Sequence, residues 1–263
     1  MPALAIAFAA VLGLVVGSFL NVVIWRVPRG ESVVRPPSHC PACDAPVRPR
    51  DNVPVLSWLL LRGRCRDCGA PISRRYPLVE ALTAVVFALL AWRLLHLDLP
   101  SAVPAYLYLG AISVALGLID IDVRRLPDVI TLPSYGVAAV LLLLPTLVED
   151  DWGAYVRALI GLAALYAFYF VLWFAYPKGM GFGDVKLAGI LGLYLGWLGW
   201  RELVSGAFLG FFLGGVLGGV MMLLGRANRK TQIPYGPYML VGALLAVLAG
   251  RPLAELYLGT LGR

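Results

Sequence analysis

The sequence predicts an all-α integral membrane protein with about eight transmembrane helices and one small insertion outside the membrane. Of its 263 residues, 60% are hydrophobic and only 14% are charged, which leaves too few polar residues to cover a soluble domain. The apolar residues also gather into runs of about 20 residues, the length that crosses the hydrocarbon core of a bilayer. The one long polar segment, residues 26–76, is the candidate for an extramembrane domain.

The predicted spans are the apolar runs between polar segments. They cover residues 3–25, 78–95, 103–119, 129–147, 154–176, 185–200, 203–224 and 237–258. The run 185–200 is the shortest, and only Arg201 and Glu202 separate it from the next, so these two runs can also form one bent helix. No cleavage site of small residues follows the first run, which predicts a retained span and not a removable signal peptide.

A stripe of glycines predicts a packing face in the run 203–224. Every fourth residue there is a glycine, at Gly206, Gly210, Gly214 and Gly218. Residues at this spacing share one face of a helix, and a face without side chains lets a neighbouring helix approach closely. We therefore predict a structural role for these glycines and no ligand.

The basic residues set the predicted orientation. A net charge of +7 is compatible with nucleic acid binding, but the basic residues lie between the spans and not along one exposed face. One set of loops holds ten arginines between Arg26 and Arg75, together with Arg124, Arg125, Lys178, Arg226, Arg229 and Lys230. The positive-inside rule places that set in the cytoplasm, and an even number of spans then places both termini outside. The predicted partner is thus the lipid bilayer, with no nucleic acid.

All four cysteines lie in the segment 26–76, as two CxxC pairs: Cys40, Cys43, Cys65 and Cys68. Two such turns aim four thiolates at one point, which completes the tetrahedral shell of a structural zinc ion. Disulfides are disfavoured because the predicted cytoplasmic side is reducing, and a catalytic zinc is disfavoured because four thiolates leave no open position. A dithiol redox pair stays an alternative. His39, beside Cys40, is expected not to bind the metal.

Two acidic residues fall at the ends of predicted spans, where ionisable groups are costly and therefore indicate function. Asp120 follows the run 103–119, and Asp184 precedes the run 185–200. In the predicted topology both lie at cytoplasmic helix ends, so they can meet. Two carboxyl groups that share a site keep one proton between them, so the charged one activates water and the protonated one polarises a peptide carbonyl. The sequence thus predicts an aspartyl protease with Asp120 and Asp184 as its catalytic residues.

The residues around these aspartates have predicted roles of their own. Gly181 and Gly183 are candidate substrate-binding residues, because glycines let the backbone before Asp184 run extended beside a substrate strand. Asp128 is predicted to cap the helix that it opens, and capping is the alternative role of Asp184 itself. Lys186 is placed to lower the pKa of Asp184 or to neutralise its charge.

Several motifs together resemble the bacterial type IV prepilin peptidase family over almost the whole chain. They are GSFLNVVIWRVP at 17–28, the two CxxC pairs, DNVPVLSW at 51–58, RYPLVE at 75–80, Asp120 with LPD at 126–128, and GFGD at 181–184. The resemblance implies an enzyme of the bacterial inner membrane that cleaves the leader peptides of prepilins and pseudopilins at the cytoplasmic face, just after a glycine. The aspartates of the family match Asp120 and Asp184.

The resemblance also implies a second reaction, N-methylation of the new amino terminus with S-adenosylmethionine. The chain shows no glycine-rich strand-to-helix turn of the usual kind for this cofactor, so peptidase activity alone stays an alternative. Glu80 is the candidate residue for touching the cofactor or the new amine, and a helix-start acid is its alternative role. Asp44, Asp51 and Asp67 are candidates for binding the positively charged leader.

These predictions divide the chain into a first transmembrane helix at 1–25, a cytoplasmic zinc-binding loop domain at 26–76 and a transmembrane peptidase bundle at 77–263. Three other classes stay as alternatives. A thiol redox enzyme would use the CxxC pairs without needing the aspartates. A proton-coupled transporter would place its acids near the bilayer midplane and show internal repeats, and the sequence shows neither. An intramembrane protease of the presenilin type shares GxGD but lacks the double CxxC loop.

Overall fold

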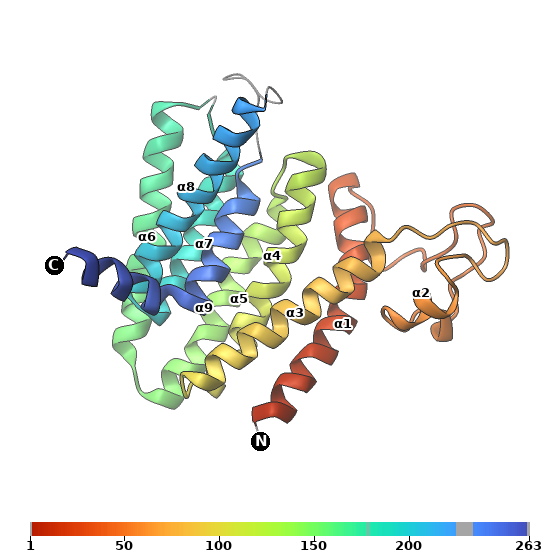
Figure 1. Cartoon of the computed structure of the whole chain (residues 1–263), viewed down its shortest axis with the longest axis horizontal. Helices are drawn as coiled ribbons and strands as arrows, with labels where there is room; N and C mark the ends of the chain where they lie inside the picture. The colour runs from red at the N-terminus through yellow and green to blue at the C-terminus, as the bar shows by residue number, and fades with distance from the viewer. Residues whose placement is uncertain (1, 178, 225–233, 262–263) are drawn as a thin grey trace. The chain divides into compact units, whose positions relative to one another are not determined.

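The computed structural model of the protein describes residues 2–177, 179–224 and 234–261, which fold into helices joined by turns (Figure 1). The chain divides into two compact units, residues 1–92 and residues 93–263. Four of the basic residues that set the predicted orientation lie outside the described residues: Lys178, Arg226, Arg229 and Lys230.

Each of the eight predicted spans coincides with a long helix. These helices are α1 (Pro2–Arg26), α3 (Arg75–His96), α4 (Val103–Val123), α5 (Asp128–Glu149), α6 (Trp152–Ala175), α7 (Phe182–Leu198), α8 (Trp200–Leu223) and α9 (Gly236–Leu261). Among the described residues, six helices are long and apolar enough to cross a membrane, namely α1, α3, α4, α5, α6 and α8. Helix α7 has 17 residues, and within the described residues of α9 the apolar stretch is Gly236–Gly250. The all-helical membrane fold is confirmed, while eight crossings stay a prediction.

The runs 185–200 and 203–224 form two helices and not one bent helix. Helix α7 ends at Leu198, and α8 starts at Trp200 after the extended residue Gly199. The chain folds back at this point, because a Cβ on Gly206 of α8 would lie 2.5 Å from Cδ1 of Leu195 on α7. A single extended glycine, Gly199, therefore separates the two helices, and Arg201 and Glu202 lie in the first turn of α8.

In the first unit, α1 lies against α3 through glycines. A Cβ on Gly13 would lie 2.6 Å from the Cα of Ala84, and one on Gly17 would lie 2.7 Å from the Cα of Glu80. One turn further along α1, the Asn21 amide donates to the backbone oxygen of Tyr76 at 3.2 Å. This close approach of two backbones requires the absence of side chains at both glycines.

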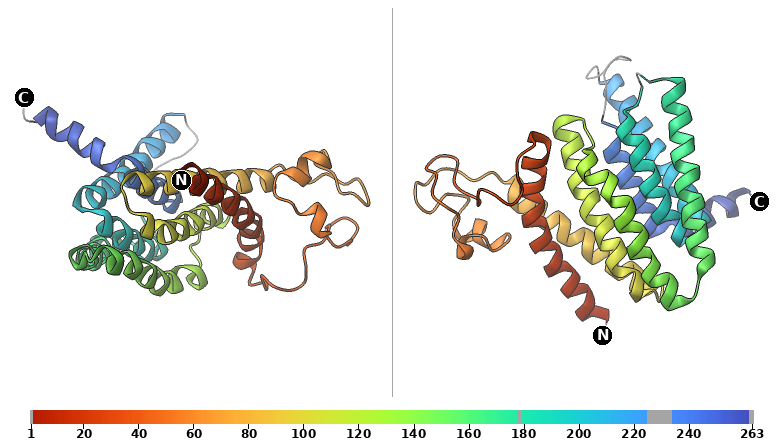
Figure 2. Two further views of the ribbon diagram at one scale, coloured as in Figure 1. Left: turned by 90° about the horizontal axis from the view of Figure 1, so that it is seen from below. Right: turned by 180° about the vertical axis from the view of Figure 1, so that it is seen from behind.

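In the second unit, α7 is the central helix and contacts α5, α6, α8 and α9 (Figures 1 and 2). Every residue from Asp184 to Leu198 except Lys186 is buried. On the α6 side, the Arg157 guanidinium donates to the carbonyl oxygens of Gly196 and Trp197 at 2.7 and 2.8 Å. These are among the last carbonyls of α7, which have no partner within the helix, so Arg157 satisfies them.

The glycine stripe of α8 packs against α9 and the residue before it, as predicted, at Gly206, Gly210 and Gly214. A Cβ on Gly206 would lie 3.2 Å from the Ala246 Cβ, and one on Gly210 would lie 3.3 Å from the Cα of Met239. A Cβ on Gly214 would lie 2.8 Å from the ring of Tyr235. The stripe is therefore the face of α8 against which the start of α9 packs.

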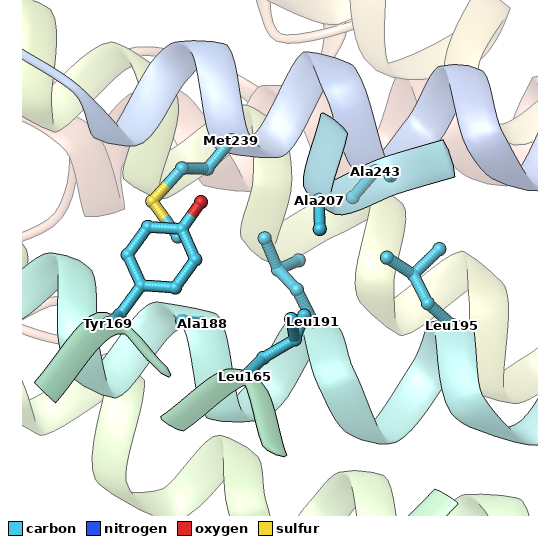
Figure 3. A pocket seen from close by; sticks show the side chains of 9 residues that line it. Leu165, Tyr169, Ala188, Leu191, Leu195, Ala207, Met239 and Ala243 are labelled. Atoms are coloured by element: carbon cyan, nitrogen blue, oxygen red, sulfur yellow. The ribbon is translucent and has the colours of Figure 1, made fainter. Parts of the chain in front are cut away.

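One small cavity remains where α6, α7, α8 and α9 meet (Figure 3). Its lining is almost entirely apolar: Leu165, Tyr169, Ala188, Leu191, Leu195, Gly206, Ala207, Met239 and Ala243. The cavity has a volume of about 10 Å³. A single water molecule needs at least about that much space, so we interpret the cavity as a packing gap.

Candidate active site and cysteine cluster

Asp120 lies in the last turn of α4 and is 5% exposed. The helix ends three residues later, where Arg124 adopts a left-handed conformation and its amide donates to the Asp120 carbonyl oxygen at 2.9 Å. The carboxyl oxygen Oδ2 of Asp120 accepts a hydrogen bond of 3.2 Å from the backbone amide of Gly236, 116 residues further along the chain. The start of α9 therefore holds this side chain in place.

Asp184 lies in the first turn of α7 and is 7% exposed. Its Oδ2 accepts a hydrogen bond of 3.1 Å from the amide of Gly181, the residue just before the helix. Asp184 thus does cap its own helix, which was the alternative role predicted for it. Capping uses one oxygen of a group that has two, so it is compatible with chemistry at the other oxygen.

The structure places the two aspartates in one region, and their role as catalytic residues stays a prediction. They are close enough for the charge of Asp120 to act on the carboxyl group of Asp184. Leu126 joins the two halves of the site: its side chain would meet a Cβ on Gly183 at 3.0 Å and one on Gly236 at 3.5 Å. The end of α4 and the starts of α7 and α9 therefore converge on one region that holds two buried carboxyl groups.

Two tyrosines beside Asp184 were missed by the sequence analysis. The hydroxyl of Tyr169 on α6 lies 3.4 Å from that of Tyr235, and both hydroxyls are within electrostatic reach of Asp184. The ring of Phe211 packs against both tyrosine rings. A signal was present for Tyr235, because it immediately precedes an apolar run at the same predicted membrane face as the aspartates.

The structure corrects three details around the pair. Gly183 lies in the first turn of α7 and not in an extended segment; only Gly181 is extended. Asp128 makes no capping hydrogen bond, and its carboxylate instead pairs with the Lys186 ammonium at 2.7 Å. Lys186 is therefore engaged by Asp128, not by Asp184. The pairing of Asp128 with Lys186 depends on α5 lying beside α7, which sequence spacing does not reveal.

The four cysteines form one cluster, as predicted. Their sulfur atoms all lie within 4.8 Å of one another. The two CxxC turns repeat the same backbone hydrogen bond. The Asp44 amide donates to the Cys40 carbonyl oxygen at 2.9 Å, and the Gly69 amide donates to the Cys65 carbonyl oxygen at 3.0 Å. Asp44 and Gly69 both adopt the left-handed conformation that such a turn requires.

The geometry and the donor set fit a zinc ion. Four thiolates at about 2.3 Å from a tetrahedral zinc lie about 3.8 Å apart, and the sulfurs of Cys40 and Cys68 are 3.8 Å apart. A hydrogen bond with the Ala42 amide lowers the pKa of Cys40 to about 7. The Ala45 amide acts in the same sense on Cys43, but the neighbouring thiols, led by Cys68, outweigh it and raise the pKa of Cys43 to about 12. A cation among the four sulfurs would relieve this crowding of charge.

Two ion pairs hold the loop around the cluster. The Arg66 guanidinium binds Asp51 at 2.6 Å and holds the pKa of that carboxyl group below its ordinary value, and Arg48 binds Asp67 at 2.7 Å. Two of the three acids that were candidates for binding a positively charged leader are therefore already paired within the loop. His39 makes its contact with the Pro37 oxygen at 3.2 Å and is not part of the sulfur cluster.

Glu80 lies in α3 and is 7% exposed. Its Oε2 accepts a hydrogen bond of 2.7 Å from the amide of Val55, and its carboxyl group also bonds to the Ser18 side chain of α1. Val55 has a φ of 60°, a conformation that a β-branched residue rarely adopts. One buried carboxyl group thus holds the loop domain to both helices of the first unit.

Comparison with known proteins is consistent with this site. Residues 11–94 match the Bacterial Peptidase A24 N-terminal domain, and residues 107–223 match the Type IV leader peptidase family. A prepilin leader peptidase/N-methyltransferase of Stutzerimonas stutzeri is 35% identical over 95% of this chain and 92% of its own length. One of Aeromonas hydrophila is 36% identical over 98% and 95%. No solved structure matches the chain. The chain belongs to the type IV leader peptidase family.

Proposed function

We propose that this protein cleaves the leader peptides of type IV prepilins and pseudopilins and then N-methylates the new amino terminus with S-adenosylmethionine. The observation that carries the proposal is the buried carboxyl pair of Asp120 and Asp184, which two separate helices bring together. The names of the relatives, prepilin leader peptidase/N-methyltransferase, support the two reactions.

In the proposed cleavage step, the charged member of the pair removes a proton from water while the protonated member donates its proton to the scissile carbonyl oxygen. The resulting hydroxide adds to the carbonyl carbon and gives a tetrahedral intermediate. Its collapse breaks the C–N bond: the leaving amine takes a proton from the carboxyl group that was the base, and one hydroxyl of the intermediate returns its proton to the carboxylate that was the acid, which restores the starting state of the pair. Burial keeps the two carboxyl groups from being fully charged together, which is what this mechanism requires.

The remaining parts of the proposal concern the surroundings of the pair. The four cysteines hold a structural zinc ion, which supplies a rigid centre for the loop domain 26–76 and no chemistry of its own. Residues 1–25 anchor this loop, and residues 77–263 form the peptidase bundle. We further propose eight crossings of the inner membrane, with the aspartates at the cytoplasmic face and both termini outside. Gly181 and Gly183 lie beside the substrate at the start of α7.

Incubating the purified protein in liposomes with a synthetic prepilin tests the proposal. Mass spectrometry should show cleavage after the glycine that precedes the apolar segment, followed by a gain of one methyl group when S-adenosylmethionine is present. A precursor with that glycine replaced by a bulky residue is the matched control. Folded, membrane-inserted enzyme that leaves the precursor intact would refute the peptidase assignment, whereas cleavage without methylation would leave a peptidase alone.

We predict that Glu80→Gln lowers methyl transfer about 100-fold, the scale of a lost general base, while cleavage stays near the wild-type rate. A glutamine oxygen can still accept the Val55 hydrogen bond, so the loop keeps its anchor, but glutamine cannot take a proton from the new amino terminus. Initial rates of both reactions on the same enzyme preparation measure this. Full methylation by Glu80→Gln, combined with loss of folding in Glu80→Ala, would make Glu80 purely structural.

A further inference from the structure

We infer that Tyr235 and Gly236 position the aspartate pair, so that the turn before α9 is a third part of the active site beside the ends of α4 and α7. The inference rests on the proposed function of Asp120 and Asp184. The Gly236 amide donates a hydrogen bond to Asp120, while the Tyr235 hydroxyl pairs with that of Tyr169 within electrostatic reach of Asp184.

Gly236 acts on Asp120. Its amide donates to Asp120 Oδ2 at 3.2 Å, and a Cβ at this position would lie 2.8 Å from the same oxygen and 3.5 Å from Leu126. A side chain here would therefore push the carboxyl group out of its place. The buried residue Gly236 gives Asp120 the one backbone hydrogen bond that the described residues offer its carboxyl group.

Tyr235 acts on the other half of the site. Its hydroxyl lies 3.4 Å from that of Tyr169, and Asp184 is within electrostatic reach of both. The Tyr235 ring packs against the ring of Phe211, with centroids 5.7 Å apart, and against Gly214, where the absence of a side chain leaves room for it. The tyrosine pair thus presents two hydroxyl groups at a fixed place beside a carboxyl group that must gain and lose a proton.

The same turn therefore couples the two aspartates. A displacement of α9 would move the amide that holds Asp120 and the hydroxyl beside Asp184 together, because Tyr235 and Gly236 are consecutive. Asp120 and Asp184 come from α4 and α7, and Leu126 lies beside both Gly183, the residue before Asp184, and Gly236, which holds Asp120. Positioning of this kind affects the rate of the chemical step more than the binding of the substrate helix.

Steady-state cleavage by four variants tests the inference, with Asp120→Asn as the reference for the proposed function. We expect Tyr235→Phe to lower kcat about 10-fold, the scale of one lost hydrogen bond near a charged group, with KM unchanged. Gly236→Ala should lower kcat further. Tyr238→Phe is the matched control on the same turn. Gly242→Ala is the matched control on α9, because its Cβ would meet the backbone of Gly210 and not an aspartate.

The two control variants should keep the wild-type kcat, with or without a loss of thermal stability. Methylation of a pre-cleaved pilin should be retained in all variants. If Tyr235→Phe and Tyr169→Phe act through one pair, the double variant should be no slower than the slower single variant. Wild-type kcat in Tyr235→Phe overturns the role of its hydroxyl, whether or not Gly236→Ala folds. Equal loss of both reactions would mean a structural role only. Retained cleavage in Asp120→Asn would instead overturn the proposed function.

Discussion

Asp120→Asn and Asp184→Asn are each expected to lower prepilin cleavage about 1,000-fold or more, the scale of a lost acid or base in the transition state. An asparagine keeps the size of the side chain and an oxygen that accepts the hydrogen bond from Gly236 or Gly181, so the helix ends should keep their places. It cannot exchange the proton that the reaction needs. Cleavage assays in detergent and in liposomes measure the loss.

Methyl transfer to a pre-cleaved pilin should continue in both variants, since we place that reaction elsewhere. Asp128→Asn is the matched control, because it removes an acid close to the site whose carboxylate pairs with Lys186 and not with the aspartate pair. Cleavage at the wild-type rate by either asparagine variant would show that the chemistry belongs to other residues, and loss of both reactions would point to misfolding.

Removal of zinc is expected to unfold the loop domain and to lower methylation more than cleavage. A segment of about 50 residues buries too little apolar surface to fold without a bound metal or a cross-link. The aspartates, by contrast, are held by α4, α7 and α9. Purified enzyme should contain one zinc per chain. Chelation should raise amide hydrogen exchange within residues 38–71, where the two CxxC turns and their hydrogen bonds lie, and should leave exchange in α7 unchanged.

Cys43→Ser and Cys68→Ser should reproduce the effect of chelation without a chelator present. His39→Ala is the matched control, since His39 contacts a backbone oxygen and not the sulfur cluster. Metal-free enzyme that keeps both activities equally would contradict the proposal that methylation depends on the zinc-bound loop more than cleavage does. A metal content of zero in active, freshly purified enzyme would contradict the zinc site itself.

The sequence was most informative where the signal is local. Apolar runs predicted the long helices because lipid demands a continuous apolar surface, and the two CxxC turns predicted the cysteine cluster because each turn is built from neighbouring residues. Asp120 and Asp184 were predicted as a pair because a membrane makes ionisable residues rare and brings alternate loops to one face.

Contacts between distant segments could not be predicted in this way. The bond from Gly236 to Asp120 spans 116 residues, and the pairing of Lys186 with Asp128 depends on α5 lying beside α7. The left-handed conformation of Val55 opposes the local preference of valine, and only the distant acceptor Glu80 explains it. Each of these residues is ordinary in its own sequence neighbourhood.

The burial of α7 from Asp184 to Leu198, with Lys186 as the exception, frees this helix from the thickness of the bilayer. A helix of 17 residues is about 26 Å long, which is shorter than a hydrocarbon core of about 30 Å. A helix facing lipid would meet that mismatch by tilting or by thinning the membrane, but α7 faces protein along its length. We therefore expect Asp184, at its start, to lie below the level of the lipid headgroups, so that under the proposed function a substrate helix would need only a short stretch of unwound backbone to bring its peptide bond to the aspartates.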